Sequence, residues 1–599
     1  MGRLFTLAAP LLFLLLAVAG GTSAAPTNMA ADTVYRNGRI YTADPMNHFR
    51  EAIAFRDGRV VYVGSSAGTR RYVGAATRAV DLKGRFAMPG LVDGHMHPLE
   101  GGQGLLKCNL DYERLTVPQL QLRLQACLDA SRNHEPDGWL EVVNWFQQGM
   151  LPAGVPIKST TIDALRTQRP ILVRDAFGHT ALANTRAVAL AGITHATPDP
   201  LGGRINRNAA GEATGLLEDA AQRVCEDLIP APTAAEDVAA VRAALAALAA
   251  AGVTSALDAD SKPPNMAAFA AVDRAGGLTA RIHLAVHIEP TEGADPAAAV
   301  SRVLAAHRNF DRGAPLPTPH LTVRNAKMFL DGVISGPAFT GAMIEPYLVD
   351  AGVQATPRWV PGSGRGPAVY YPAPVLADIL VRLARVGIDP HMHADGDLAV
   401  RAGLDAVAAM RRAVPRADIR PALAHDEIVA RADYPRFKAL GTYPVLSLQW
   451  GKPAPDTVEQ LRDYLGAERA AILEPAGLLL AAGAQVAFGS DWPVDALDEW
   501  FALKVAVTRT NSPASGYSGR LGADPGLTRL QALRAATIVA AYELHAERVT
   551  GSLQVGKFAD LIVLDRDPLS IPAEDIANVR VLETTVGGRV VYTAPGAAF

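Results

Sequence analysis

The chain has 599 residues, of which 49% are hydrophobic and 20% are charged, and its formal net charge is −3. A chain of this length and apolar content can bury a large core and is expected to form more than one domain. Because the charges nearly balance and form no long single-sign block, the composition argues against a nucleic-acid-binding protein.

An export signal is predicted at the N-terminus. Arg3 precedes an apolar run from Leu4 to Ala19, and small residues that include Thr22 and Ala24 follow this run. The run is short for a membrane span, and its flanks are typical of a secretory signal peptide. We therefore expect residues 1–24 to be removed and the protein to be periplasmic or secreted, with no stable membrane span in the mature chain. An uncleaved anchor is the alternative.

The cysteine content is too low for a fold that depends on disulfides. Cys108, Cys127 and Cys225 are the only cysteines, and none forms a CxxC pair. Three buried thiols are the expectation, and one disulfide with one free thiol is the alternative.

Both ends of the mature chain, residues 25–86 and 546–599, predict β structure. Asn37-Gly38 and Asp57-Gly58 are turn dipeptides between alternating apolar stretches. Near the C-terminus, Leu561 to Leu564 and Arg589 to Tyr592 are strand-like. We expect the two ends to form one small β-sandwich domain together.

The region between them, residues 87–545, alternates apolar strands with helices, which is typical of an α/β protein with a parallel sheet. Its clearest helix begins with a capping box of Thr233 and Glu236 and ends at Gly252. Eight strands are expected, and eight strand–helix units predict a (β/α)8 barrel like that of the TIM fold. These strands are Ala87–His95, Val253–Ala259, Arg281–Ile288, Leu321–Leu330, Val386–His393, Pro421–His425, Tyr443–Trp450 and Gln485–Ser490.

A long insertion follows the first expected strand. Residues from about 100 to 228 are too many for an ordinary loop between a strand and a helix. We expect them to form a lid or wall over the barrel mouth. Within the insertion, Pro170 to Asp175 is itself strand-like and could displace one of the eight barrel strands.

Polar residues gather at the predicted C-terminal strand ends, where barrel enzymes place their functional groups. His95 and His97 end the first strand, and alternate residues of a strand point to the same side. Each polar residue at a strand end, taken alone, could have a purely structural role. Their joint placement at one end of the barrel favours a metal site, because imidazole and carboxylate groups suit zinc and similar divalent ions. The remaining candidates are Lys327 in the fourth strand, His393 at the end of the fifth, His425 at the end of the sixth and Asp491 after the eighth.

The ordered motifs of the chain resemble those of the amidohydrolase superfamily. Within it, the chain is similar to the amidohydrolase 3 branch, which includes YtcJ-like and N-substituted formamide deformylase-like proteins. The resemblance covers nearly all of the mature chain. The superfamily motifs are Pro89–His97, Gly252–Ser255, Gly489–Asp491 and Gly551–Leu564, and the branch motifs are Gly178–Asn184, Gly202–Ile205, Lys327–Gly332 and His393–Asp397.

The resemblance implies a site with two divalent metal ions, usually zinc. It implies that His95 and His97 bind one ion with Asp491, and that His393 and His425 bind the other. Lys327 would be N-carboxylated and bridge both, which would also remove the cost of burying its charge. The reaction implied is hydrolysis of an amide-type C–N bond of a small molecule by a metal-bound hydroxide, with Asp491 as general base.

Two departures from the branch pattern affect these expectations. Pro390 lies inside the fifth strand and His391 competes with His393 as a ligand, although His393 carries the continuation that the branch shows. After Gly332, residues 333–337 depart from the usual Ser/Arg/Thr-rich sequence, which leaves the substrate open.

Aromatic and charged side chains near the barrel mouth are candidates for substrate contact. Trp450 and Trp492 follow the seventh and eighth strands, and aromatic groups there suit an apolar or aromatic part of the substrate. Packing of the lid against the barrel is the alternative role for the tryptophans, and a structural role is favoured for His179. The candidates in the lid are Trp145, Arg174 and His179.

Other functions remain as alternatives. A mononuclear deaminase or a metal-dependent esterase or lactonase of the same superfamily is the nearest, although deaminases generally lack the bridging lysine. A non-catalytic binding protein is more remote, as is a serine hydrolase, whose G-x-S-x-G pattern occurs at residues 64–68 without the strand–turn–helix context that it needs. The native metal and the oligomeric state are open, and a homo-oligomer is compatible with the sequence.

Overall fold

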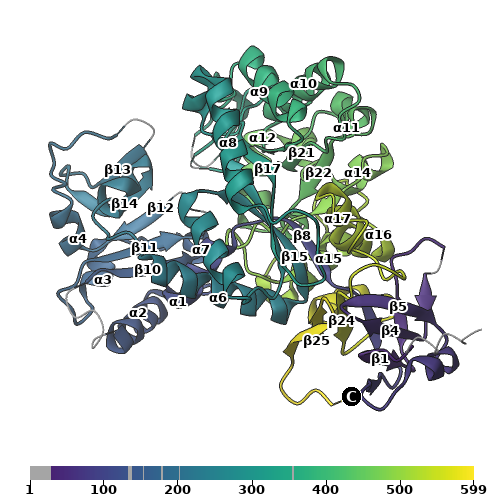
Figure 1. The fold of residues 1–599 in the computed structure, drawn as a ribbon. Coiled ribbons are helices and arrows are strands. Elements are labelled where there is room, and N and C mark those ends of the chain that lie inside the picture. Colours follow the sequence, from purple (N-terminus) through teal and green to yellow (C-terminus); the bar gives the residue numbers. More distant parts are fainter. Residues whose placement is uncertain are drawn as a thin grey trace, which may run out of the picture.

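The computed structural model describes residues 29–46, 48–131, 138–152, 154–176, 178, 180–200, 203–336, 338–353 and 356–598. The segment expected to be a signal peptide lies outside these residues. Figure 1 shows a barrel of strands and helices, with an inserted sheet on one side and a β-rich region built from both ends of the chain on the other.

Eight parallel strands form the barrel sheet, which confirms the expected fold class. Each strand pairs in parallel with the next one in chain order. The first and last strands meet where the N–H of Asp491 donates to the carbonyl of His95 at 2.8 Å. In sheet order the strands are β8 (Leu91–Met96), β15 (Val253–Ser261), β16 (Arg281–His287), β17 (Leu321–Phe329), β20 (Asp389–Ala394), β21 (Ala422–His425), β22 (Tyr443–Leu446) and β23 (Ala487–Phe488).

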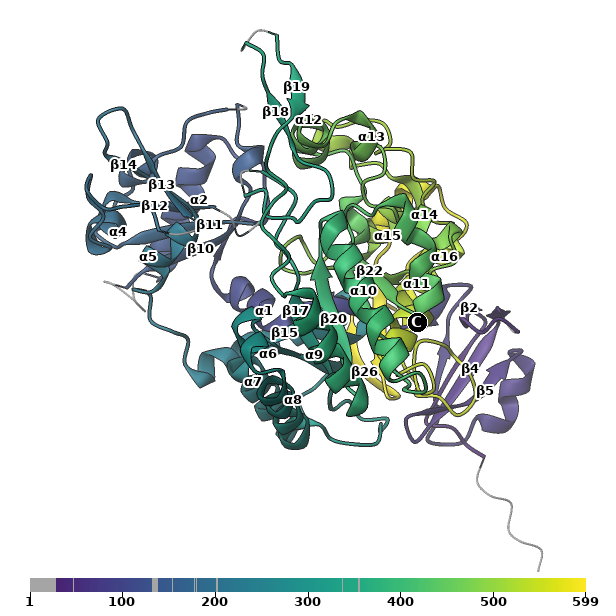
Figure 2. The same ribbon diagram turned by 90° about the horizontal axis from the view of Figure 1, so that it is seen from above.

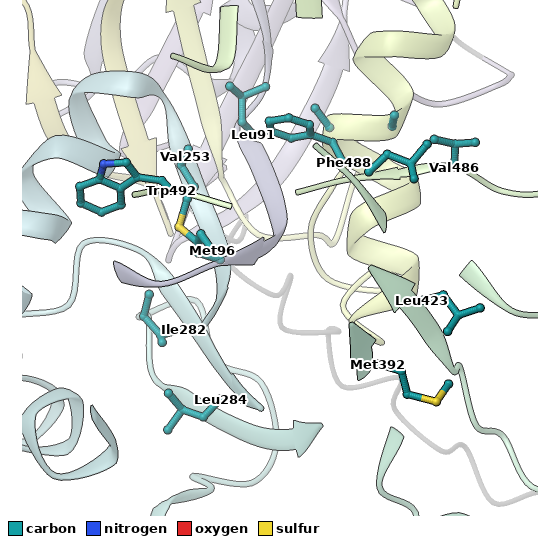
Figure 3. Packing of buried hydrophobic residues seen from close by; sticks show 14 of the residues in the cluster. Leu91, Met96, Val253, Ile282, Leu284, Met392, Leu423, Val486, Phe488 and Trp492 are labelled. Carbon is teal, nitrogen blue, oxygen red and sulfur yellow. The ribbon is translucent and has the colours of Figure 1, made fainter. Parts of the chain in front are cut away.

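Helices cover the outside of this sheet because their apolar faces pack on the outward side chains of the strands. The helix α6 (Ala234–Ala251) begins and ends as expected, with the Thr233–Glu236 capping box and a left-handed Gly252 at φ 89°. Further along the chain, α9 (Ala373–Arg385) and α10 (Asp397–Ala413) pack against β20 (Figure 2). Met96, which lies between His95 and His97, and Met392, which precedes His393, are buried in this outer layer (Figure 3).

The first expected strand, Ala87–His95, is in fact two strands in different sheets. The strand β7 (Phe86–Pro89) pairs with β24 (Leu561–Leu564) in the terminal sheet, and β8 begins only after Gly90. The chain changes sheet at Gly90, where a Cβ atom would lie 2.1 Å from Cγ2 of Thr254 in β15. The missing side chain therefore allows the close approach of the two sheets.

Both ends of the chain contribute to the β-rich region, as expected. A four-stranded sheet contains β1 (Thr33–Arg36), and a six-stranded sheet joins β2 (Arg39–Tyr41) and β7 to the C-terminal strands. Buried side chains from both ends share one core, and the hydroxyl of Tyr35 donates to Glu583 at 2.5 Å. The remaining strands are β3 (Phe49–Arg50), β4 (Ala52–Arg56), β5 (Arg59–Gly64), β6 (Arg78–Asp81), β25 (Val581–Val586) and β26 (Arg589–Thr593).

The insertion forms a second mixed sheet of six strands beside the barrel (Figure 1). The strand-like segment around residue 172 is β11 (Ile171–Asp175) of this sheet and displaces no barrel strand. Cys108 in β9 (Cys108–Asn109) is joined by a disulfide to Cys127 in α2 (Val117–Ser131), so the expectation of three thiols is wrong, and Cys225 is the buried free cysteine. The other strands are β10 (Leu140–Trp145), β12 (Thr180–Ala183), β13 (Gly203–Arg207) and β14 (Ala213–Asp219).

Across the described ranges, no helix combines the length and the apolar character that a bilayer crossing requires.

Replacing Gly90 by alanine should destabilise the fold, because the new Cβ would overlap buried Thr254. Overpacking of this kind costs about 1–3 kcal/mol, so the midpoint of urea denaturation should fall. Gly364→Ala is the matched control, because no heavy atom lies within 4 Å of a Cβ at that position. Equal midpoints for the two variants would contradict the close approach at Gly90.

Candidate metal-dependent active site

A cavity of about 450 Å³ opens at the C-terminal ends of the barrel strands. Side chains of the inserted sheet and its loops, including Phe146 and Thr180, line part of its wall. All six residues predicted to form the metal site border this one cavity: His95, His97, Lys327, His393, His425 and Asp491.

The junction of β8 and β23 places the first group of ligands. Asp93 accepts hydrogen bonds from the backbone N–H of His95 at 2.9 Å and from that of Ser490 at 3.0 Å. A Cβ atom on Gly489 would lie 2.5 Å from the Cβ of His95, so only glycine permits this approach. The Gly489-Ser490-Asp491 motif therefore positions Asp491 next to the end of β8.

Asp491 faces both histidines of the first strand. Its Oδ1 lies 3.4 Å from Nε2 of His95 and 3.1 Å from Nε2 of His97, and its backbone has φ 57°. Aspartate adopts a left-handed backbone more readily than most residues other than glycine. Burial by itself would raise the pKa of Asp491, but the close contact with His97 and the nearby charges outweigh it and lower the pKa. Asp491 is thus held as a carboxylate.

Lys327 is fully buried among these groups. Its Nζ lies 3.3 Å from Nε2 of His95 and 4.5 Å from the centroid of the Phe329 ring. Burial, which disfavours the ammonium form, lowers the pKa of Lys327 to about 8. An amine that is easily neutralised suits the N-carboxylated form that the resemblance implies, because only the neutral amine can react with CO2.

The second group of ligands comes from β20 and β21. Nε2 of His393 lies 3.0 Å from the carbonyl oxygen of Gly332, which can only accept, so Nε2 carries the proton and Nδ1 is left to bind a metal. His425 has φ 80°, its Nδ1 has no hydrogen-bond partner among the described residues, and its ring lies 4.5 Å from that of His393. Burial lowers the pKa of His393 to about 3 and that of His425 well below its ordinary value. Both rings are neutral, which is the form that binds metal.

The donor atoms fit divalent ions. His95, His425 and Asp491 form one group and His393, Asp395 and His425 another, and in each group the ligand atoms lie within 4.8 Å of one another. Buried nitrogen and carboxylate donors that converge in this way match the preferences of zinc and similar ions. A third group of this kind contains His97 with Glu100 and Asp258.

His391 lies deeper in the barrel than His393 does. It is fully buried, is not among the residues that line the cavity, and its Nε2 contacts Nδ1 of His95 at 2.7 Å. His393, in contrast, borders the cavity. The geometry therefore favours His393 as the ligand from this strand.

Of the candidates for substrate contact, Trp450 lines the cavity, where its ring stacks on His425 at 5.4 Å. Trp145 and Trp492 are buried in hydrophobic clusters. Arg174 lies 3.3 Å from both Glu141 and Glu226, and none of these three candidates is among the lining residues. His179 lies outside the described residues.

Several residues that line the cavity were not predicted from the sequence. Asp395 and Glu427 each lie two residues after a predicted metal-binding histidine, and that spacing was a usable signal. No sequence signal pointed to Phe329 and Phe501, because an aromatic residue after an apolar run is usually part of a hydrophobic core. The serine motif at residues 64–68 follows β5, which pairs antiparallel with β4, so it lacks the parallel sheet that a nucleophile elbow needs.

Comparisons with known proteins agree with this geometry. The sequence pattern described as "Amidohydrolase family" matches residues 78–592. The chain is 25% identical over 576 residues to N-substituted formamide deformylase of Arthrobacter pascens, covering 94% of this chain and 99% of that one. It is 27% identical over 568 residues to the putative amidohydrolase YtcJ of Bacillus subtilis, covering 93% and 99%. It is also 28% identical over 583 residues to Protein LONG AFTER FAR-RED 3 of Arabidopsis thaliana, covering 95% and 92%.

Two solved structures share the fold. An uncharacterized metal-dependent hydrolase from Pyrococcus furiosus superposes with a TM-score of 0.64 at 22% identity, over 90% of this chain and 100% of that one. A second, from Pyrococcus horikoshii, gives a TM-score of 0.67 at 21% identity, over 90% and 99%.

Proposed function

Because the chain belongs to the amidohydrolase family, we propose that it hydrolyses an amide-type C–N bond of a small molecule and uses Asp491 as the general base. The observation that carries this proposal is the position of Asp491 Oδ1, 3.4 Å from His95 and 3.1 Å from His97 at the wall of the cavity. A carboxylate held beside two imidazoles can bind a metal and still exchange a proton with a water beside it.

We further propose that the site holds two divalent ions, with zinc the first candidate. His95, His97 and Asp491 would hold one, His393 and His425 the other, and N-carboxylated Lys327 would bridge them. Bound metal ions of this kind lower the pKa of a water molecule to near 7 and polarise the scissile carbonyl group. Lys327 supports a site with two ions because its amine is fully buried beside a proposed ligand, 3.3 Å from Nε2 of His95, where carboxylation would replace its positive charge.

The chain's own groups would then manage the proton. Asp491 accepts a proton from the attacking water and returns it to the leaving nitrogen, which departs as an amine. Asp491 is only 4% exposed, so the buried groups around it, rather than solvent, fix the orientation of its carboxylate.

The part of the substrate away from the bond is proposed to be apolar or aromatic. Trp450, Phe146, Phe329 and Phe501 line the cavity and offer flat apolar surfaces.

Asp491→Asn should lower the turnover rate by about 10²–10⁴-fold, because the amide cannot accept the proton of the attacking water. Rates are measured on N-formyl amines, N-acyl amines, cyclic amides, carbamates, esters and lactones, with circular dichroism as a check of the fold. Asp495→Asn alters another carboxylate of the cavity wall and is the matched control. A near-normal rate for Asp491→Asn would remove Asp491 from the role of base.

Purified protein should contain about two divalent ions per chain, and Lys327→Ala should contain one or fewer. Mass spectrometry of metals in protein prepared without a chelator measures this, and short carboxylic acids such as acetate should restore part of the lost activity by filling the space of the bridging group. Lys504→Ala removes another buried lysine, which donates to Thr510 outside the cavity, and should keep its metal. One ion in the wild type would favour the mononuclear deaminase, and full occupancy in Lys327→Ala would eliminate the bridge.

Export to the periplasm or the medium is proposed from the apolar run of residues 4–19, and the disulfide between Cys108 and Cys127 supports it, because disulfides persist mainly in oxidising compartments. Protein recovered from periplasm or medium should begin near residue 25 when its intact mass is measured. A chain lacking residues 1–24 should stay in the cytoplasm. Recovery of only full-length cytoplasmic protein from the wild-type gene would contradict export.

A further inference from the structure

Behind the cavity, a buried row of three ionisable side chains starts at His95. Its Nε2 faces the metal site, at 3.3 Å from Nζ of Lys327 and 3.4 Å from Oδ1 of Asp491. Its other nitrogen, Nδ1, faces away from the cavity and contacts Nε2 of His391 at 2.7 Å. His95 therefore has one nitrogen for a metal and one for His391.

The row ends at Glu543, which lies in the short helix α17 (Ala540–Glu543). Nδ1 of His391 and Oε1 of Glu543 are 3.5 Å apart, and both residues are fully buried. Neither this nitrogen nor either oxygen of Glu543 has a hydrogen-bond partner among the described residues. A buried polar group in this position requires an explanation.

Glu543 lies inside the barrel next to β8, the strand that carries His95. Neighbouring residues of α17 pack against Val92, Ala422 and Tyr443, which lie in the N-terminal halves of barrel strands. A Cβ atom on Gly94 would lie 3.6 Å from Oε2 of Glu543. The carboxyl group thus occupies the barrel interior directly below the residue that precedes His95.

The hydrogen-bond directions follow from which nitrogen binds the metal. When Nε2 of His95 is a ligand, its proton is on Nδ1, and this N–H can only donate to Nε2 of His391. His391 then carries its own proton on Nδ1, which faces Glu543. A carboxyl group has an acceptor oxygen in either protonation state, so Glu543 completes the row.

We propose that Glu543 and His391 are positioning residues that hold His95 in the tautomer and orientation needed for metal binding. The inference rests on the proposed function, since it takes His95 to be a metal ligand. Groups that hold the second nitrogen of a ligating histidine commonly affect metal affinity by 10–100-fold. This assigns a role to His391, which competes with His393 in the sequence but does not reach the cavity.

The test compares metal affinity in full-length variants. Glu543→Leu and His391→Phe each remove one acceptor while roughly conserving volume, and each should weaken zinc binding by about 10–100-fold in competition with a fluorescent zinc chelator. Glu543→Gln keeps an acceptor oxygen and should recover most of the affinity that Glu543→Leu loses. The visible absorption spectrum of cobalt-substituted protein should change in the Leu and Phe variants and match the wild type in the Gln variant.

Glu583→Gln is the matched control, because Glu583 is also buried but lies in β25 and bonds to Tyr35. Any loss of stability in this variant should leave zinc affinity unchanged. The proposal is overturned if Glu543→Leu or His391→Phe binds zinc as tightly as the wild type, or if Glu543→Gln is no better than Glu543→Leu. Should one of the two apolar variants fail to fold, the other decides the same point. A wild-type protein without metal would instead overturn the proposed function, and this inference with it.

Discussion

The barrel closes where Asp93 accepts hydrogen bonds from the backbone N–H groups of His95 and Ser490. The same contact that joins the first and last strands also sets the distance between the two sets of side chains that follow them. Gly489 makes the approach sterically possible, and the next residues deliver Asp491 to His95 and His97. Closure of the fold and assembly of the site are thus one event, and an error of register in β23 would lose both.

Burying this many ionisable groups in one place is unfavourable for the protein alone. Desolvation lowers the pKa of Lys327 to about 8, and Asp491 remains a carboxylate only because His97 and the nearby charges outweigh its burial. Burial lowers the pKa values of His95, His393 and His425, so these three imidazoles carry no positive charge. Bound divalent ions would supply positive charge next to the buried carboxylate and imidazole groups. The folded barrel is therefore better suited to the metal-bound state than to a site without metal.

Much of this arrangement could be predicted because it follows from patterns of neighbouring residues in the sequence. Alternation along a strand makes His95 and His97 point the same way, and eight apolar segments gave the barrel. The break at Gly90 was missed because continuous apolar residues do not reveal which sheet they join. The disulfide was missed because pairing depends on the distance between β9 and α2 in space. Glu543 was missed for the same reason, since nothing near it in the sequence points to His391.

The barrel and the insertion, which forms the lid, contribute different parts of the site. All six predicted ligands come from the barrel, whereas Phe146 and Thr180 bring the inserted sheet to the cavity wall. The hydroxyl of Tyr112 in the insertion donates to the carbonyl of Pro493 at 2.7 Å, two residues after Asp491. This bond ties the lid to the loop that carries the proposed base. A different lid could therefore change which molecule fits the cavity while the closing junction and the ligands below it stay as they are.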